Sequence, residues 1–474
     1  MSQNRARAHD RLYVDGEWRS VDGRIEVGDL AEGGTVATVG AGSEADADAA
    51  LAAADRSAIG ESTIVERAEW LGAIADGIEA RRAELAETIA REAGKPITGA
   101  RGEVDSAAER FRRAVEEARN LDGEYREGTT AGHEGWEAIV RPEPVGVVLC
   151  IAPYNYPLAT TALQVAPALA AGNAVVLKPA SQTPVSALLL AEVVDGIDLP
   201  KGAFNVVTGR SSEIGDPLAS DGRVDAVAMT GSSGAGEHVA RESGMVNLHM
   251  ELGGNAPALI FPDADLAEAA GACAKGALKY AGQRCSAVSR VLAHESVHDG
   301  LAARLDREVA SYEVGNPLDE STDLGPLISE EQADWVEELV DDALAQGATL
   351  AHGGDRDGRR FEPTLLTNVP HDARILREEQ FGPVVALAAV ADEAEALELA
   401  NAGDLGLDGC VFTADHDRAM RVADALEAGA VRINGAPSHG LGDIPFGGVN
   451  ASGIGREGLG VSIEAFTTTK SIVL

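Results

Sequence analysis

Hydrophobic positions follow two different periods along this chain. Between residues 44 and 118, Ala, Glu and Arg recur at helical spacing, which predicts two or three surface helices. From residue 145 onward, short apolar runs alternate with helical segments. This alternation predicts βαβ units and a parallel sheet. The predicted strands are Val145–Ile151, Ala174–Leu177, Ala203–Val207 and Ala226–Met229, and the predicted helices are Val165–Ala171 and Ser186–Val194.

A second region of alternating strands and helices begins near Ala258 and fills most of the remaining chain. Asp265 can cap a helix that runs to about Tyr280, and Gly282 can end it. Cys285 then falls in a loop or at the start of the next helix. A chain of 474 residues is too long for one hydrophobic core, so the two regions predict two or three domains.

The ends of the chain carry shorter signals. Tyr13–Ser20 predicts a short strand and a turn. Glu464–Leu474 contains a Thr-rich run followed by Ser-Ile-Val-Leu, a β-prone composition that predicts an interface strand. Met1–Asp10 is polar and charged, without the apolar centre of a secretion signal.

One passage, Pro144–Leu177, has no charged residue and is long enough to cross a bilayer. Prolines and amide side chains interrupt it, and lipid penalises such groups. The passage therefore predicts a buried strand, loop, helix and strand, and no membrane partner is expected.

The charge of the chain narrows the possible partners. There are 39 basic and 77 acidic residues, which gives a net charge of −38. No basic excess is present to neutralise phosphates, so nucleic acid is excluded as a partner. The acids are spread along the chain, which indicates a solvated acidic shell and a halophilic protein in a high-salt cytoplasm.

The four cysteines are few for so long a chain, which is typical of a reducing, cytoplasmic compartment. They form no CxxC pair and no cluster with histidine, so no metal site is predicted. Their positions are Cys150, Cys273, Cys285 and Cys410.

Five segments concentrate Gly, Pro and polar residues between apolar runs. Taken singly, each has an ordinary role: Asn155 as a turn residue, Glu251 as a helix-capping acid, Cys285 as a small buried side chain. The segments are Pro153-Tyr-Asn-Tyr-Pro157, Leu177-Lys-Pro-Ala-Ser181, Glu251-Leu-Gly-Gly254, Gly282-Gln-Arg-Cys285 and Glu378-Glu-Gln-Phe-Gly-Pro383.

Together, in this order, the five segments resemble the aldehyde dehydrogenase superfamily from about Leu12 to Leu474. The resemblance implies that Cys285 is the nucleophile and Glu251 the general base, 34 residues earlier in the chain. It implies that the Asn155 amide and the Cys285 backbone N–H stabilise the oxyanion. The implied activity is oxidation of an aldehyde to a carboxylate with NAD(P)+. A non-catalytic cofactor-binding protein and a thiol esterase are the alternatives.

The resemblance also implies an α/β fold with a Rossmann-type cofactor domain, an α/β catalytic domain and a small bridging β-sheet. The expected limits are 1–121 and 142–252 for the cofactor domain, 253–461 for the catalytic domain, and 122–141 with 462–474 for the bridging sheet. A homodimer or homotetramer is expected.

Cofactor positions follow from the same resemblance. Lys178 is expected at the adenosine ribose, and Glu379 at the nicotinamide ribose with Phe381 packed beside it. Members that prefer NAD often carry glutamate where this chain has Ser181, so NADP is favoured, with use of both cofactors as the alternative. The residues expected near the pyrophosphate are Gly209, Gly215, Gly231 and Ser232.

The sequence limits the choice of substrate less than the choice of cofactor. Several segments resemble the branch that contains non-phosphorylating glyceraldehyde-3-phosphate dehydrogenase and archaeal lactaldehyde dehydrogenase. Tyr156, Arg284 and His439 are assigned to the substrate, and Arg112 or Arg113 could also bind an anionic group. The phosphate-using enzymes carry an arginine where this chain has His439, and a neutral histidine is a weaker phosphate ligand. Glyceraldehyde 3-phosphate, a smaller hydroxyaldehyde and a semialdehyde therefore all remain open.

Overall fold

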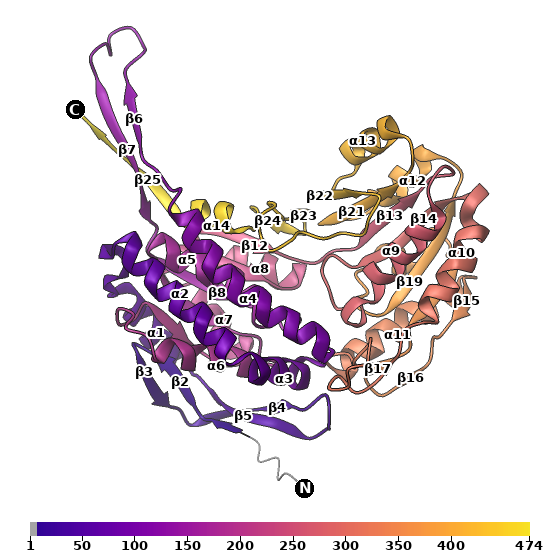
Figure 1. The fold of residues 1–474 in the computed structure, drawn as a ribbon, viewed down its shortest axis with the longest axis horizontal. Helices are drawn as coiled ribbons and strands as arrows, with labels where there is room; N and C mark the ends of the chain where they lie inside the picture. The colour runs from indigo at the N-terminus through magenta and orange to yellow at the C-terminus, as the bar shows by residue number, and fades with distance from the viewer. Residues whose placement is uncertain (1–6) are drawn as a thin grey trace.

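The computed structural model describes residues 7–474 and contains two large sheets, each with helices packed against it (Figure 1). The first sheet has eight strands in the order β24-β12-β11-β8-β9-β10-β2-β3. Neighbouring strands from β12 to β10 are parallel, which confirms the predicted βαβ units. The strands are β2 (Arg11–Val14), β3 (Glu17–Ser20), β8 (Val147–Ile151), β9 (Ala174–Lys178), β10 (Phe204–Val206), β11 (Ala226–Thr230), β12 (Asn247–Glu251) and β24 (Gly453–Ile454).

Strands β2 and β3 form an antiparallel hairpin, which confirms the strand and turn predicted over residues 13–20. Asp15 and Gly16 in its turn have φ of 61° and 72°. Two consecutive positive φ angles are what a two-residue turn between twisted strands requires.

The region 44–118 contains four α-helices, not two or three. Arg81 separates the second helix from the third, and the third ends at Gly94, where φ is 69°. The helices are also not confined to the surface, because their alanine-rich faces are buried. The four helices are α1 (Glu44–Asp55), α2 (Ile64–Ala80), α3 (Arg82–Ala93) and α4 (Ile97–Ala118).

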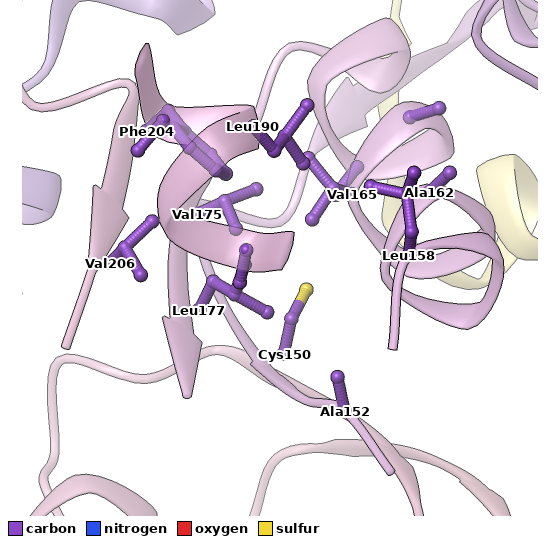
Figure 2. Close-up of a cluster of buried hydrophobic side chains, with 14 of the residues drawn as sticks. Cys150, Ala152, Leu158, Ala162, Val165, Val175, Leu177, Leu190, Phe204 and Val206 are labelled. Atoms are coloured by element: carbon purple, nitrogen blue, oxygen red, sulfur yellow. The ribbon is translucent and has the colours of Figure 1, made fainter. Parts of the chain in front are cut away.

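The uncharged passage forms β8, a loop, α5 and β9, as predicted, although α5 begins at Ala159 and not near Val165. Figure 2 shows Cys150 of β8 among Val175 and Leu177 of β9 and apolar side chains of α5, so this cysteine fills space in the core. No helix within residues 7–474 is long and apolar enough to span a membrane. The helices between these strands are α5 (Ala159–Ala171), α6 (Val185–Asp195), α7 (Ser211–Ala219) and α8 (Ser233–Glu242).

The second sheet has seven strands in the order β15-β18-β19-β14-β13-β21-β22, and only β15 runs antiparallel to its neighbour. Its strands are β13 (Ala256–Ile260), β14 (Val288–His294), β15 (Thr349–His352), β18 (Thr364–Thr367), β19 (Val384–Val390), β21 (Asp408–Phe412) and β22 (Ala430–Ile433). Its helices are α9 (Leu266–Leu278), α10 (Glu295–Val309), α11 (Glu330–Ala345), α12 (Glu393–Ala400) and α13 (His416–Ala425).

Asp265 caps α9 as predicted, since its carboxylate accepts from the N–H groups of Ala267 and Glu268. The helix ends at Leu278, earlier than expected, because the next turn leaves helical geometry.

A third sheet of three strands projects from the body of the protein (Figure 1). Strand β7 (Glu137–Pro144) lies between β6 (Glu124–Glu127) and β25 (Thr467–Val473), and both pairs are antiparallel. The predicted strand after Glu464 is therefore confirmed as a strand. Its outer faces leave apolar side chains exposed: Tyr125, Trp136, Ile139, Ile472, Val473 and Leu474.

The chain returns to the first sheet before it reaches β25. Strand β24 pairs with β12, and Leu459 and Ile463 of α14 (Leu459–Ala465) belong to the first hydrophobic core. Short strands complete the fold: β1 (Arg7–His9), β4 (Gly23–Gly28), β5 (Thr35–Ala41), β16 (Arg356–Asp357), β17 (Arg360–Phe361), β20 (Leu405–Gly406) and β23 (Val449–Asn450).

Candidate active site

Most of the predicted site residues lie at or just beyond the carboxyl ends of parallel strands. Lys178 and Glu251 end β9 and β12, while Asn155 and Ser232 follow β8 and β11. Strand β9 lies beside β8 on one side and β11 lies beside β8 on the other side, so the strand order reverses at β8. Ligands of open α/β sheets bind at such a reversal of strand order.

Cys285 follows a turn of unusual backbone geometry. Tyr280, Ala281 and Gly282 all have positive φ, at 56°, 50° and 72°. A Cβ on Gly282 would lie 2.0 Å from the carbonyl oxygen of Gly382, so only glycine fits there. The Tyr280 hydroxyl donates to the Ala93 carbonyl at 2.6 Å, which anchors the turn to the last residue of α3. Backbone strain of this kind persists where the surroundings fix it, and such sites are often functional.

The Cys285 thiol faces a cavity but is held in its neutral form. Burial raises its pKa, and the nearby Glu251 carboxylate adds to that shift. The thiol therefore needs a base to become a nucleophile.

Glu251 is placed to act on that thiol. Its side chain is buried, and neither carboxylate oxygen has a hydrogen-bond partner among residues 7–474. Burial raises its pKa well above the usual value, and the negative charges of Glu457 and Asp408 act in the same direction. A Cβ on Gly447 would lie 2.9 Å from the Glu251 carboxylate, so the glycine there leaves the carboxylate its room.

Asn155 is buried and points toward the cysteine loop. Its amide Nδ2 donates to the Gln283 carbonyl at 2.9 Å. Because a side-chain amide has two N–H donors, one remains available to a reacting oxygen. Gln283 in turn accepts from the Ile328 N–H, which fixes the loop from the other side.

Asn155, Glu251 and Cys285 all line one cavity of about 710 Å³. Tyr156, Arg284 and His439, the residues expected to contact substrate, line the same cavity. Its wall also carries Arg110, Lys275 and Lys279, which the sequence did not single out.

The predicted anion ligands Arg112 and Arg113 do not line this cavity, which corrects that expectation. Arg112 is paired with Asp76 and Glu79 on α2, and Arg113 is paired with Glu109 and Asp443. Arg112 lies two positions, or about 200°, from Arg110 on the helix and so faces away from it. Arg113 lies closer to the Arg110 face, but its ion pairs with Glu109 and Asp443 occupy its guanidinium.

The chain's similarity to known proteins agrees with this geometry. The profile of the "Aldehyde dehydrogenase family" matches residues 18–472. A 3-sulfolactaldehyde dehydrogenase of Priestia megaterium is 38% identical over 464 residues, which cover 98% of this chain and 97% of that protein. An NADP-dependent glyceraldehyde-3-phosphate dehydrogenase of Streptococcus equinus is 40% identical over 465 residues, 97% of this chain and 98% of that protein.

The chain belongs to the aldehyde dehydrogenase family. The crystal structure of NADP-dependent glyceraldehyde-3-phosphate dehydrogenase from Bacillus halodurans, complexed with NADP, superposes with a TM-score of 0.96. It is 38% identical and covers 98% of this chain and 99% of that chain. These findings confirm the expected fold class, and the chain is an NAD(P)-dependent aldehyde oxidoreductase.

The residues of this aldehyde dehydrogenase fit a dinucleotide at the strand ends of the first sheet. Lys178 is buried without an ion pair among the described residues, and burial lowers its pKa to about 8. The Ser181 hydroxyl donates to the Gly209 carbonyl at 2.9 Å, which ties the loop after β9 to the loop after β10. A Cβ on Gly209 would lie 2.6 Å from the Ile214 side chain, so a bulkier residue would push α7 away.

The start of α8 fits an anionic group. Ser232 caps the helix, and the Ser233 hydroxyl is buried with no hydrogen-bond partner in residues 7–474. Unpaired N–H groups and a free hydroxyl at a helix N-terminus suit a phosphate. Gly231 precedes this cap, and Gly215 lies in the middle of α7, where a Cβ would meet only Ser211.

The loop that carries Glu379 and Phe381 is held close to this region. Glu379 accepts from the Gly254 N–H at 2.9 Å, and burial raises its pKa to about 7. The Phe381 ring meets the Tyr154 ring edge-on, with centroids 6.0 Å apart. From α11, the Trp335 indole donates to the Glu379 carbonyl, which keeps the loop in place.

Three further residues of the site escaped the sequence analysis. Arg110 is half-buried and donates to the carbonyls of Ala159 and Leu441, while Glu457 faces both Arg110 and Glu251. Burial raises the pKa of Glu457 to about 7. Asp408 is hydrogen-bonded to His439. Within residues 7–474 no cluster of His, Cys, Asp and Glu could hold a metal ion.

Proposed function

We propose that this chain oxidises a short, polar aldehyde to its carboxylate through a covalent intermediate on Cys285, with Glu251 as general base and Asn155 as oxyanion donor. One observation carries the proposal: three groups line the same cavity. They are the Cys285 thiol, the buried Glu251 carboxylate, which has no hydrogen-bond partner among the described residues, and the Asn155 amide, which has one N–H left for a ligand.

The geometry supports a specific order of steps. Glu251 removes the thiol proton, and the Cys285 sulfur attacks the aldehyde carbon. The oxygen, now negatively charged, is stabilised by the second N–H of Asn155 and by the Cys285 backbone N–H, and losing one such donor costs about 3–4 kcal/mol. Bound NAD(P)+ would supply the acceptor for the hydride that leaves that carbon as the thioester forms, and Lys178, Glu379 and the N-terminus of α8 would hold the cofactor. Glu251 releases the thiol proton to solvent and, ionised again, accepts a proton from the water that hydrolyses the thioester, so the acid leaves and the Cys285 thiol is restored.

The cavity supports a substrate with a polar or anionic end. Arg110, Arg284 and two lysines of the α9 segment place positive charge on the wall around Cys285. The relatives are named for aldehydes with a sulfonate, a phosphate or a carboxylate, and also for lactaldehyde. A semialdehyde, glyceraldehyde 3-phosphate and a small hydroxyaldehyde all fit this description.

Use of NADP in preference to NAD is supported by three side chains. Ser181 brings no negative charge to the loop after β9. Lys178 ends β9 and Arg210 follows β10, so both lie at the carboxyl ends of neighbouring parallel strands. A 2′-phosphate would meet two cations there and no carboxylate at position 181.

The assembly and its setting are part of the proposal. Exposed apolar side chains on the three-stranded sheet support a homodimer or homotetramer that buries this face. The expected domain limits stay a prediction. The pairing of β24 with β12 favours one change to them, in which the catalytic domain ends before residue 453 and not at residue 461. The net charge of −38 and the few cysteines support a cytoplasmic protein of a high-salt cell.

The test is the formation of reduced cofactor over a panel of short aldehydes, with NAD+ and NADP+ compared at equal concentration. Glyceraldehyde 3-phosphate, succinic semialdehyde and lactaldehyde cover the three classes. Oxidation of at least one with a preference for NADP+ is expected, and Cys285→Ala should abolish it while cofactor binding remains. Turnover by Cys285→Ala above about a hundredth of the wild-type rate, some 2.7 kcal/mol of barrier, would remove Cys285 from the mechanism.

A further inference from the structure

A buried carboxylate and an imidazole meet at the edge of the aldehyde cavity. His439, in the loop after β22, places Nε2 2.9 Å from Oδ2 of Asp408, the first residue of β21. The Asp408 side chain is 2% exposed and that of His439 is 18% exposed. The imidazole also stacks on the Phe446 ring, with centroids 3.7 Å apart and planes at 23°. Two contacts thus fix the orientation of the ring.

The second ring nitrogen of His439 is available to a ligand. Nδ1 makes no hydrogen bond to any residue in the part of the chain that the structure describes, and the imidazole lines the cavity with Cys285 and Arg284. A polar group of a bound aldehyde is therefore the natural partner for Nδ1.

The number of protons on the pair decides what Nδ1 can do. The contact between Nε2 and the carboxylate oxygen takes one proton, whichever atom carries it. With one proton, the pair has a net charge of −1, and Nδ1 is a hydrogen-bond acceptor. With two protons, the pair is neutral, and Nδ1–H is a donor. The same ring thus offers opposite hydrogen-bonding character to the substrate at two pH values.

We propose that the Asp408–His439 pair determines which aldehydes this enzyme prefers. With one proton, it accepts a hydrogen bond from the hydroxyl of an uncharged hydroxyaldehyde. With two protons, it donates to the anionic end of a charged aldehyde. His439 contacts the substrate, and Asp408 is a positioning residue that acts through it. The inference rests on the proposed function, because it assigns a substrate class to the same cavity.

Other charged groups face the pair from the surrounding elements. Arg284, before β14, faces Asp408 and stays charged at all relevant pH values. From β12, Glu251 feels the charge of Asp408, and Glu457 titrates near neutral pH as well. Arg110 and the two lysines of the α9 segment line the cavity wall. Asp443, in the same loop as His439, forms an ion pair with Arg113. A test must therefore separate His439 from the groups that every substrate uses.

A ratio of two substrates makes that separation. We would measure kcat/KM for succinic semialdehyde and for 4-hydroxybutanal, which have chains of equal length, at the same pH values from about 5.5 to 8.5, the range in which histidine titrates. A carboxylate stays ionised over this range, so only the enzyme changes its charge. Effects on the reacting carbon act on both aldehydes and cancel in the ratio, whereas the charge of Glu457 on the cavity wall acts mainly on the anionic aldehyde, so the pair is assigned only the part of the pH dependence that His439→Gln removes. The ratio of anionic to neutral substrate should fall about tenfold as pH rises.

Substitutions at the pair should raise or lower this ratio of kcat/KM values in predicted directions. His439→Gln should make it low and remove most of its pH dependence, while His439→Arg, a permanent cation, should make it high and also remove most of its pH dependence. Asp408→Asn should keep the pH dependence but move its midpoint to lower pH, because the imidazolium loses its counter-charge. His416→Gln, on the exposed start of α13, is the matched control and should behave as the wild type.

Two results would overturn the proposal: a wild-type ratio that does not change with pH, or a pH dependence in His439→Gln as large as in the wild type. If neither aldehyde is oxidised, the pair is tested by binding. Succinate, the product acid, should then bind to the Cys285→Ala protein about tenfold more weakly at high pH, and His439→Gln should remove that difference. Equal or absent succinate binding at all pH values would also overturn it.

Discussion

The carboxylate of Glu251, the proposed general base, is unusual because it is buried without a hydrogen bond among the described residues. Such a group is costly to ionise, so it holds a proton more tightly than an exposed glutamate and is a stronger base once ionised. In Glu251, this state depends on its neighbours, since Gly447 leaves space beside it and Glu457 repels its charge.

Glu251→Gln should separate the two halves of the reaction. A neutral amide of the same shape cannot activate water, so thioester hydrolysis should slow by about 100-fold or more, more than hydride transfer. Rapid mixing should then show one burst of reduced cofactor followed by stalled turnover. Equal slowing of the burst and of the steady rate would contradict the larger role of Glu251 in activating water, and Glu251→Asp is the control that keeps the charge.

We expect cofactor choice to depend on Ser181, at the proposed adenosine end of the site. Ser181→Glu should repel the 2′-phosphate of NADP+ and offer an acceptor to the 2′-hydroxyl of NAD+. A partly screened charge pair is worth about 1–4 kcal/mol, so the preference for NADP+ should fall roughly tenfold or more. The change should appear in the Michaelis constants of the cofactors.

Ser181→Ala is the matched control for that measurement. It removes the hydrogen bond to Gly209 without adding charge, so it separates loop anchoring from repulsion. A shift in Ser181→Ala as large as in Ser181→Glu would show that charge is not the cause. Lys178 and Arg210 would then be the positions to vary.

At the scale of elements, helix α5 starts on a buried ion pair. Glu103 of α4 pairs with Lys95 and accepts from the N–H groups of Leu158 and Ala159 at 3.0 Å and 3.1 Å. A carboxylate at a helix N-terminus satisfies free N–H groups and stabilises the helix dipole. The Lys95 ammonium also lies 3.6 Å from the centroid of the Tyr156 ring. Helix α5 thereby fixes the loop that carries the oxyanion amide.

Glu103→Gln should destabilise the protein more than an ordinary surface change. It leaves the Lys95 ammonium buried without a partner, which costs about 3–5 kcal/mol in comparable sites. Chemical denaturation measures this cost. In the double variant Lys95→Met and Glu103→Gln no buried charge remains unpaired, so a good part of the stability should return. An additive loss in the double variant would show that the pair is not what stabilises α5.

The sequence predicts the elements at the strand ends better than the residues that surround them. Lys178, Glu251 and Asn155 lie in short motifs at the ends of apolar runs, and parallel strands bring their carboxyl ends to one edge. Arg110, Asp408 and Glu457 carry no local signal, because distant elements bring them together. The positive φ of Tyr280 and Ala281 is also hidden, since tertiary contacts and not residue type impose it.

For the whole molecule, the large negative charge predicts a dependence on salt. At about 0.01 M salt the screening length is about 30 Å, so acidic groups across the entire surface repel one another. Melting temperature, association state and activity should all rise between about 0.05 M and 3 M KCl, measured by calorimetry and sedimentation. A subunit that stays associated and equally stable across this range would contradict both the halophilic character and its link to assembly.

The pairing of β25 with β7 also has a consequence for how the protein is made. Lys470 reaches back to Glu143, 327 residues earlier, and strand β7 has β6 as its only other partner in the described sheet. At about 5–20 residues per second, a ribosome needs roughly 16–65 s to deliver β25 after β7 has emerged. During that time β7 is an open sheet edge on a nascent chain, and such edges invite aggregation. Glu137, Arg141 and Glu143 place charged side chains along β7, and charged side chains discourage pairing between the open edges of neighbouring nascent chains until β25 arrives.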